Sequence, residues 1–185
     1  MERLSADYDH QPCKLFLERK TMAIRKVRVE GDPLLRKKSR NVEKIDDRTK
    51  LLLDDMVDTM YEENGIGLAA PQIGVLRRLV VIDINDGKGV YKMINPKIIK
   101  QSDELQINLE GCLSVPERSG YVERPKVLTV EYTDEEGNRQ EVEADEYFAA
   151  CVCHELDHLD GVLYIDREVE LTEEEIEALN KDKDE

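Results

Sequence analysis

The segment His154-Glu-Leu-Asp-His158 constrains the fold of this chain more than any other part of the sequence. In a helix, two histidines four residues apart lie one turn above one another, and both imidazoles can reach one metal ion. Glu155, beside the first histidine, is then placed to hydrogen-bond a metal-bound water and take its proton. The alternative is two ordinary polar helix residues, because so short a pattern also arises by chance.

A catalytic site of this kind needs a third protein ligand and an open position for water or substrate. His10 lies in an irregular stretch and is a poor candidate. Cys112 follows a predicted β segment and stands beside Gly111, where a backbone can pass close to a bound group. Cys151 is the rival ligand, and we favour Cys112 because Cys151 would have to reach over a further turn of the same helix. For Cys112, burial as a small hydrophobic side chain is the alternative.

The charge and composition exclude several classes of protein. A formal net charge of −15, from 42 acidic and 27 basic residues among 185, argues against nucleic-acid binding through a broad basic face. The sequence contains neither an apolar run of the roughly 20 residues that cross a membrane nor an N-terminal secretory signal, so we expect a cytoplasmic protein without membrane contact. The four cysteines are too few and too irregularly spaced for a disulfide framework. Because a chain of this length can fold without a structural metal, we expect any metal site to be functional.

The length predicts one globular domain. An N-terminal extension at 1–21 precedes it, with Met22 as a candidate true start, and an acidic C-terminal helix or tail follows at 171–185. Helices are predicted to begin at Asp46 or Asp47, at Asp145 and at Thr172 and to end, for the first two, near 64 and 159. Short β segments are predicted at 79–84, 91–94, 105–109, 126–132 and 140–142. This order predicts an α+β fold, with short antiparallel sheets around the helix that carries both histidines.

The segment Gly65-Ile-Gly-Leu-Ala-Ala-Pro-Gln72 follows the first predicted helix. The glycines on either side of Ile66 leave an extended edge that another backbone can approach, and Gln72 supplies an amide donor. The same residues would also serve as a plain helix end followed by a loop.

Three segments in this order resemble the signature motifs of bacterial-type peptide deformylases: GIGLAAPQ at 65–72, EGCLS at 110–114 and HELDH at 154–158. The resemblance covers about residues 22–170 and includes Asn95-Pro96 and the Ser-Val-Pro-Glu that follows Cys112. It implies hydrolysis of the formyl group from the N-terminal N-formylmethionine of newly made polypeptides, with release of formate.

The resemblance also assigns roles to particular residues. The family's metal ligands fall on Cys112, His154 and His158, its catalytic glutamate on Glu155, and its oxyanion-stabilising donors on Gln72 and the backbone N–H of Leu113. Glu155 would accept a proton from the attacking water and deliver it to the leaving amine. One thiolate and two neutral imidazoles leave a divalent ion about one net positive charge, enough to lower the pKa of bound water.

By position in the family pattern, the substrate would lie extended along Gly65 to Gly67, beside Gly111. Its methionine side chain would enter a pocket lined by Ile66, Glu110, Tyr147, Ala150 and Cys151, each of which could equally be plain core packing. Asp157 and Asp160 could orient an imidazole or could be exposed charges near a helix end. The resemblance favours ferrous iron as the native cofactor, with zinc, nickel or cobalt as replacements, and it implies a monomer that meets its substrates at the ribosome.

Two other functions compete with this interpretation. A zinc metallopeptidase that cleaves internal peptide bonds could take a third ligand from between Glu168 and Glu177, but this would leave GIGLAAPQ and EGCLS unexplained, and no further histidine follows His158. A metal-binding but catalytically silent protein would need neither Glu155 nor Gln72.

Overall fold

A computed structural model describes residues 23–181 of the chain. The extension predicted at 1–21, the candidate start Met22 and the last four residues lie outside the described part. The helices are α1 (Asp47–Glu62), α2 (Glu146–Leu159) and α3 (Glu173–Lys181), and short 3-10 turns are η1 (Pro33–Arg36), η2 (Ala70–Ile73) and η3 (Tyr164–Asp166). The strands are β1 (Gly67–Ala69), β2 (Leu79–Ile82), β3 (Tyr91–Gln101), β4 (Leu105–Cys112), β5 (Val115–Pro125), β6 (Val127–Thr133) and β7 (Arg139–Asp145).

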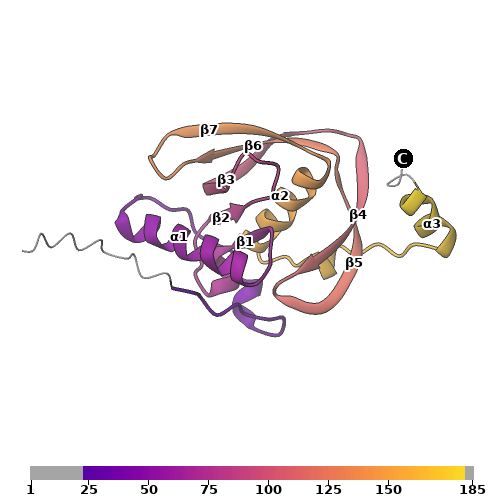
Figure 1. The fold of residues 1–185 in the computed structure, drawn as a ribbon, viewed down its shortest axis with the longest axis horizontal. Coiled ribbons are helices and arrows are strands. Elements are labelled where there is room, and N and C mark those ends of the chain that lie inside the picture. Colours follow the sequence, from indigo (N-terminus) through magenta and orange to yellow (C-terminus); the bar gives the residue numbers. More distant parts are fainter. Residues whose placement is uncertain (1–22, 182–185) are drawn as a thin grey trace, which may run out of the picture.

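The strands form two antiparallel sheets on either side of α2 (Figure 1). One sheet has five strands in the order β1-β2-β3-β6-β7, and the other is the β4–β5 pair. The predicted α+β fold is confirmed. Among the described residues, no helix is long and apolar enough to cross a membrane.

Strand β2 shows where the core lies, because all four of its residues are buried. Leu79 and Val81 pack with the apolar face of α1, whereas Val80 and Ile82 pack with α2 on the other side of the sheet. Side chains of a strand point alternately to opposite faces. The sequence of a strand that is covered on both faces is therefore a continuous apolar run. The large sheet is therefore held between the two helices.

Helix α1 begins where capping predicts. The side chain of Asp46 accepts a hydrogen bond from the Thr49 N–H at 3.0 Å and so satisfies one free donor of the first turn. The buried stripe of the helix includes Leu53, Met56 and Met60. Helix α2 is buried from Phe148 almost to its end, because sheets cover it on two sides.

Strands β1 and β5 were not predicted, and β3 is longer than predicted. β5 carries prolines near both ends and a glycine at Gly120, and its side chains show no regular alternation of burial. β3 continues through Asn95-Pro96 as far as Gln101, because the register shift between Ile94 and Lys97 accommodates the proline within the sheet. Turn-forming residues therefore mark a bulge here rather than the end of a strand.

Candidate metal centre

Helix α2 and the end of strand β4 bring the three predicted metal ligands together. His154 and His158 lie one turn apart, with their ring centroids 5.0 Å from each other. Cys112, the last residue of β4, places its Sγ 3.2 Å from His158 Nε2. One ligand atom from each of the three residues lies within 4.8 Å of the others, and Cys151 is not part of this group. Three donors at this spacing can share one ion.

Cys112 lies at a tight connection between two strands. The β4–β5 register shifts between Gly111 and Cys112, and Cys112 pairs with Val115 across a two-residue turn. Within this turn the Ser114 N–H points to Cys112 Sγ at 3.4 Å. The local backbone therefore turns the sulfur toward α2 and gives it a hydrogen-bond donor.

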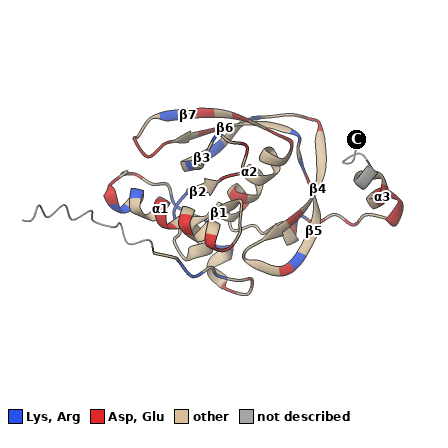
Figure 2. Cartoon of the chain, in the orientation of Figure 1, with Lys and Arg blue, Asp and Glu red and all other residues tan. Residues whose placement is uncertain are grey.

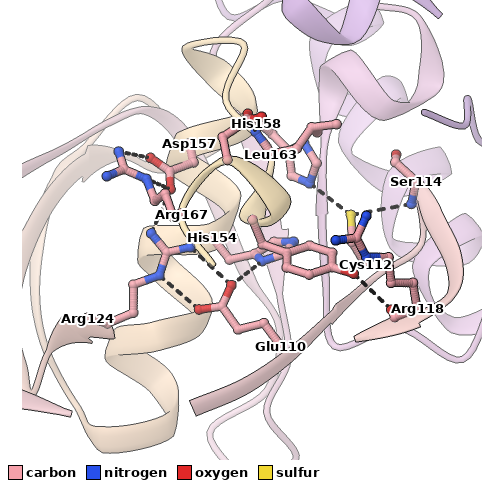
Figure 3. A network of polar contacts seen from close by, with 12 residues as sticks. Glu110, Cys112, Ser114, Arg118, Arg124, His154, Asp157, His158, Leu163 and Arg167 are labelled. Atoms are coloured by element: carbon pink, nitrogen blue, oxygen red, sulfur yellow. Dashed lines mark hydrogen bonds and ion pairs between the residues drawn. The ribbon is translucent and has the colours of Figure 1, made fainter. Parts of the chain in front are cut away.

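His154 is oriented by Glu110, as Figure 3 shows. The Nδ1 of His154 lies 2.8 Å from Glu110 Oε2, which leaves Nε2 free to face a metal. Arg124 holds the same carboxylate with two hydrogen bonds, of 2.8 and 3.0 Å. Burial alone would raise the pKa of Glu110, but its bonds to His154 and Arg124 lower it below the ordinary value. Glu110 is thus a buried carboxylate kept ionised by its partners.

The sequence analysis offered Asp157 and Asp160 for this orienting role, but within the described part of the chain neither forms a hydrogen bond or ion pair with an imidazole. Asp157 lies one step further away, 2.6 Å from Arg124 Nη1 and 2.7 Å from Arg167 Nε (Figure 3). Asp160 pairs instead with Arg78, at 3.3 Å. Helical spacing alone could not identify Glu110 as the orienting residue, because it comes from a strand far away in the sequence.

The two histidines have opposite protonation tendencies. Burial lowers the pKa of His158 well below its usual range, and its Nδ1 has no hydrogen-bond partner among the described residues. Burial also opposes the charged form of His154, but its interactions with Cys112 and Glu110 raise its pKa to about 10. Because metal ligands are neutral imidazoles, binding an ion here must release a proton.

Glu155 is buried beside the histidines and forms no ion pair with the described residues. Burial raises the pKa of Glu155 to about 7, against the opposing effect of His154, and its Oε2 has no partner among the described residues. Strand β1 passes close to this carboxylate: a Cβ added at Gly67 would lie 2.9 Å from Glu155 Cδ. Gly67, the second glycine of the GIGLAAPQ segment, therefore makes room for the Glu155 carboxylate.

Gln72 is held with its amide directed to Cys112. Its Oε1 accepts the Ala69 N–H at 2.8 Å, so Nε2 points toward Ser114 Oγ at 3.2 Å and Cys112 Sγ at 3.7 Å. Leu113 follows Cys112 in the turn between β4 and β5 and lines the same cleft. The residues of the two predicted oxyanion donors therefore both line the cleft together with the cysteine.

A cleft of about 580 Å³ opens over this group. All eight residues predicted to contact substrate line it: Gly65, Ile66, Gly67, Glu110, Gly111, Tyr147, Ala150 and Cys151. The sequence analysis missed Asn108 and the stretch from Val115 to Ser119, which also line the cleft. Side chains alternate along a strand, so counting back two residues from Glu110 on β4 would have identified Asn108. The sequence of β5 shows no pattern that could have identified its residues.

Comparisons with known proteins agree with this arrangement. The family model for polypeptide deformylase matches residues 24–174. The chain is 62% identical to the peptide deformylase of Finegoldia magna over 162 residues, which cover 88% of this chain and all of that protein. It is 50% identical to the peptide deformylase of Acetivibrio thermocellus over 163 residues, covering 88% of this chain and 94% of the relative. The crystal structure of peptide deformylase from Thermotoga maritima superposes with a TM-score of 0.77 at 42% identity, covering 80% of this chain and 99% of that one.

Proposed function

The chain belongs to the polypeptide deformylase family, whose members remove the N-formyl group from nascent peptides, and from this premise we propose which of its residues perform the reaction. Cys112, His154 and His158 hold one divalent metal ion, and Glu155 is the general base and acid. The observation that carries the proposal is the meeting of three ligand atoms within 4.8 Å, in a cleft that Glu155 also lines.

The donor set fits a metal ion of this kind. Cys112 Sγ and His158 Nε2 lie 3.2 Å apart, and Glu110 orients the third donor, the Nε2 of His154. When bound, the ion supplies positive charge that polarises the formyl oxygen and makes nearby water more acidic. Ferrous iron is the proposed native metal, with zinc, nickel or cobalt as replacements, since imidazole and thiolate ligands suit several of these ions.

Glu155 moves the proton. Its carboxylate takes a proton from the attacking water and later delivers it to the amine that leaves with the methionine. A pKa of about 7 matches this double role, because a group that titrates near the working pH is efficient both as base and as acid. The unpartnered Oε2 supports this role, because no cation among the described residues ties up the carboxylate.

Gln72 and Leu113 stabilise the charge that develops on the formyl oxygen. The amide Nε2 of Gln72 and the backbone N–H of Leu113 donate to that oxygen as the formyl carbon becomes tetrahedral. The bond from Ala69 N–H to Gln72 Oε1 holds the amide in place before substrate arrives. Donors fixed in advance need not reorganise during the reaction.

The substrate backbone binds as an added strand. β1 is an edge strand of the large sheet, so its free edge can pair with an extended peptide. Gly65, Gly67 and Gly111 line the cleft and offer backbone close to that peptide. The methionine side chain enters between Ile66, Ala150 and Cys151. We further propose that the enzyme works in the cytoplasm as a monomer and meets nascent chains at the ribosome.

Formate release tests the proposal. The full chain, prepared without oxygen and loaded with ferrous iron, is given a formyl-methionyl tripeptide and, in parallel, the unformylated peptide. Formate from the first and no cleavage of the second is the expected result. Internal cleavage without formate would favour the metallopeptidase, and neither product from fully metallated protein would favour the silent metal-binding protein.

A further inference from the structure

Asn108 lies on the face of β4 that is turned toward α2. Side chains alternate along a strand, so Asn108 shares its face with Gln106 and Glu110. Gln106 Nε2 donates to the carbonyl oxygen of Glu146 at 2.6 Å, and Glu110 contacts His154 two helical turns later. Strand β4 and helix α2 thus run side by side between these two contacts. Asn108 lies opposite the middle of this part of the helix.

This position belongs to the part of the cleft proposed for the methionine side chain. Asn108 lines the cleft together with Ala150 and Cys151, which come from the same middle stretch of α2. Two strand residues, or roughly 6.6 Å, separate Asn108 from Glu110. An unbranched side chain that extends from the reacting amide beside His154 covers a comparable distance. Asn108 is therefore within reach of the far end of that side chain.

The amide nitrogen of Asn108, Nδ2, is buried and forms no hydrogen bond with the described residues. A buried N–H without an acceptor is costly, so such a group in a native fold calls for an explanation. Rotation by half a turn about the last side-chain torsion, which has two comparable minima, exchanges Nδ2 with Oδ1. The N–H donor can then face the cleft, where a bound side chain can supply the acceptor.

Building on the deformylase function proposed above, we propose that Asn108 determines specificity by donating a hydrogen bond to an acceptor at the δ position of the substrate's first side chain. The thioether sulfur of methionine is a weak acceptor. The oxygen of methionine sulfoxide is a strong one, and burying it in a wholly apolar pocket would cost it its hydrogen bonds to water. The substrates of this enzyme therefore include peptides that begin with N-formylmethionine sulfoxide, and norleucine, which has no acceptor, loses this contact.

The test compares kcat/KM for three formylated tripeptides that differ only in the first residue: methionine, a resolved methionine sulfoxide epimer, or norleucine. Each epimer is assayed in turn with metal-loaded full-length protein. In Asn108→Leu the ratio of sulfoxide to norleucine turnover should fall about tenfold, the equivalent of one hydrogen bond. Asn108→Ser retains a hydroxyl donor, so its ratio of sulfoxide to norleucine turnover should lie between those of the wild-type protein and Asn108→Leu. This variant also provides the test if leucine at this position disturbs folding. Leu105→Asn places an amide on the opposite face of β4 and should leave the ratio unchanged.

An unchanged ratio in both Asn108 variants would overturn this inference and leave the deformylase function standing. An equal loss on all three peptides would also overturn it, because that pattern indicates a structural role for Asn108. If the wild-type protein released no formate even from the methionine peptide, the proposed function would fall, and this inference with it.

Discussion

Arg124 shows how a residue that lines no part of the substrate cleft can set the properties of the metal centre. Its side chain is only 4% exposed and lies between two carboxylates, those of Glu110 and Asp157. Through Glu110 it fixes the ring of His154 and the tautomer that would face the proposed metal ion. Arg124 is therefore a positioning residue, and its removal should affect folding and metal binding together.

We expect Arg124→Met to destabilise the fold by about 3–5 kcal/mol, because two carboxylates lose their buried partner. Metal affinity should fall by about 10- to 100-fold, the usual effect of losing a group that supports a ligand. Denaturant unfolding and metal titration measure the two effects. Arg139→Met is the matched control: Arg139 is 70% exposed, so losing its ion pairs should cost no more than about 1 kcal/mol. Equal effects of the two substitutions would contradict the role of Arg124.

Glu155→Gln should separate proton transfer from metal binding. Glutamine keeps the size of the side chain but cannot accept the proton, so kcat should fall by about 10²- to 10⁴-fold. Bound metal, measured on the same sample, should remain at the wild-type level because Glu155 is not a ligand. Unchanged turnover would remove Glu155 from its catalytic role, and loss of metal would make it a ligand instead.

At the scale of elements, the close approach of β1 to α2 predicts a steric effect at Gly67. In Gly67→Ala the new methyl group would press on the Glu155 carboxylate, 2.9 Å from Cδ. Displacing a catalytic group by about 1 Å can cost about 10²-fold in rate, while overpacking should cost about 1–3 kcal/mol of stability. Formate release and thermal unfolding are the measurements. Gly111→Ala is the control for stability, since a Cβ there meets nothing within 4 Å; equal destabilisation by both would contradict the steric account.

The N-terminus of α1 predicts a pH-dependent contribution to stability. The backbone N–H and hydroxyl of Thr49 lower the pKa of Asp46 below its ordinary value of 3.8. A carboxyl group with a lowered pKa stabilises the fold above the unfolded value, and this contribution is lost as the pH falls through the folded value. Asp46→Ala should therefore reduce stability at neutral pH and have little effect well below pH 3.8. Denaturant unfolding of the wild-type protein and the variant at neutral and at acidic pH measures this difference in stability. A difference that does not depend on pH would contradict the role of the ionised Asp46 side chain as the helix cap.

The sequence predicted the helices better than the strands for a physical reason. Amphipathic spacing and caps are local, and α1 and α2 begin where Asp46 and Asp145 mark their first turns. The pairing of β5 with β4 is not local: Arg124 stands opposite Gln106 only because of a register that the sequence around either residue does not encode. The three motifs located the proposed ligands, whereas the Arg124 link and the position of Asn108 follow only from the pairing and packing of β4.

At the scale of the whole molecule, the enclosure of α2 by two sheets explains why several polar side chains of this helix can be buried. His154, Glu155 and His158 are each less than 10% exposed, although all three are polar. The two-stranded sheet supplies Glu110 and Cys112 as partners from β4, and the cleft opens beside them. Figure 2 shows acidic residues spread over α1, the hairpin that joins β6 and β7, and α3. The net charge of the chain therefore describes the surface of the molecule. The chemistry of the site depends on a few paired groups in the interior.

The most direct test of the account is the absorption spectrum of the cobalt-substituted protein. A thiolate ligand gives a sulfur-to-metal charge-transfer band that imidazole and carboxylate ligands do not give. We expect one cobalt ion per chain, with a band that disappears in Cys112→Ser and persists in Cys151→Ser. A band that survives in Cys112→Ser, or one lost in Cys151→Ser, would contradict the proposed metal centre.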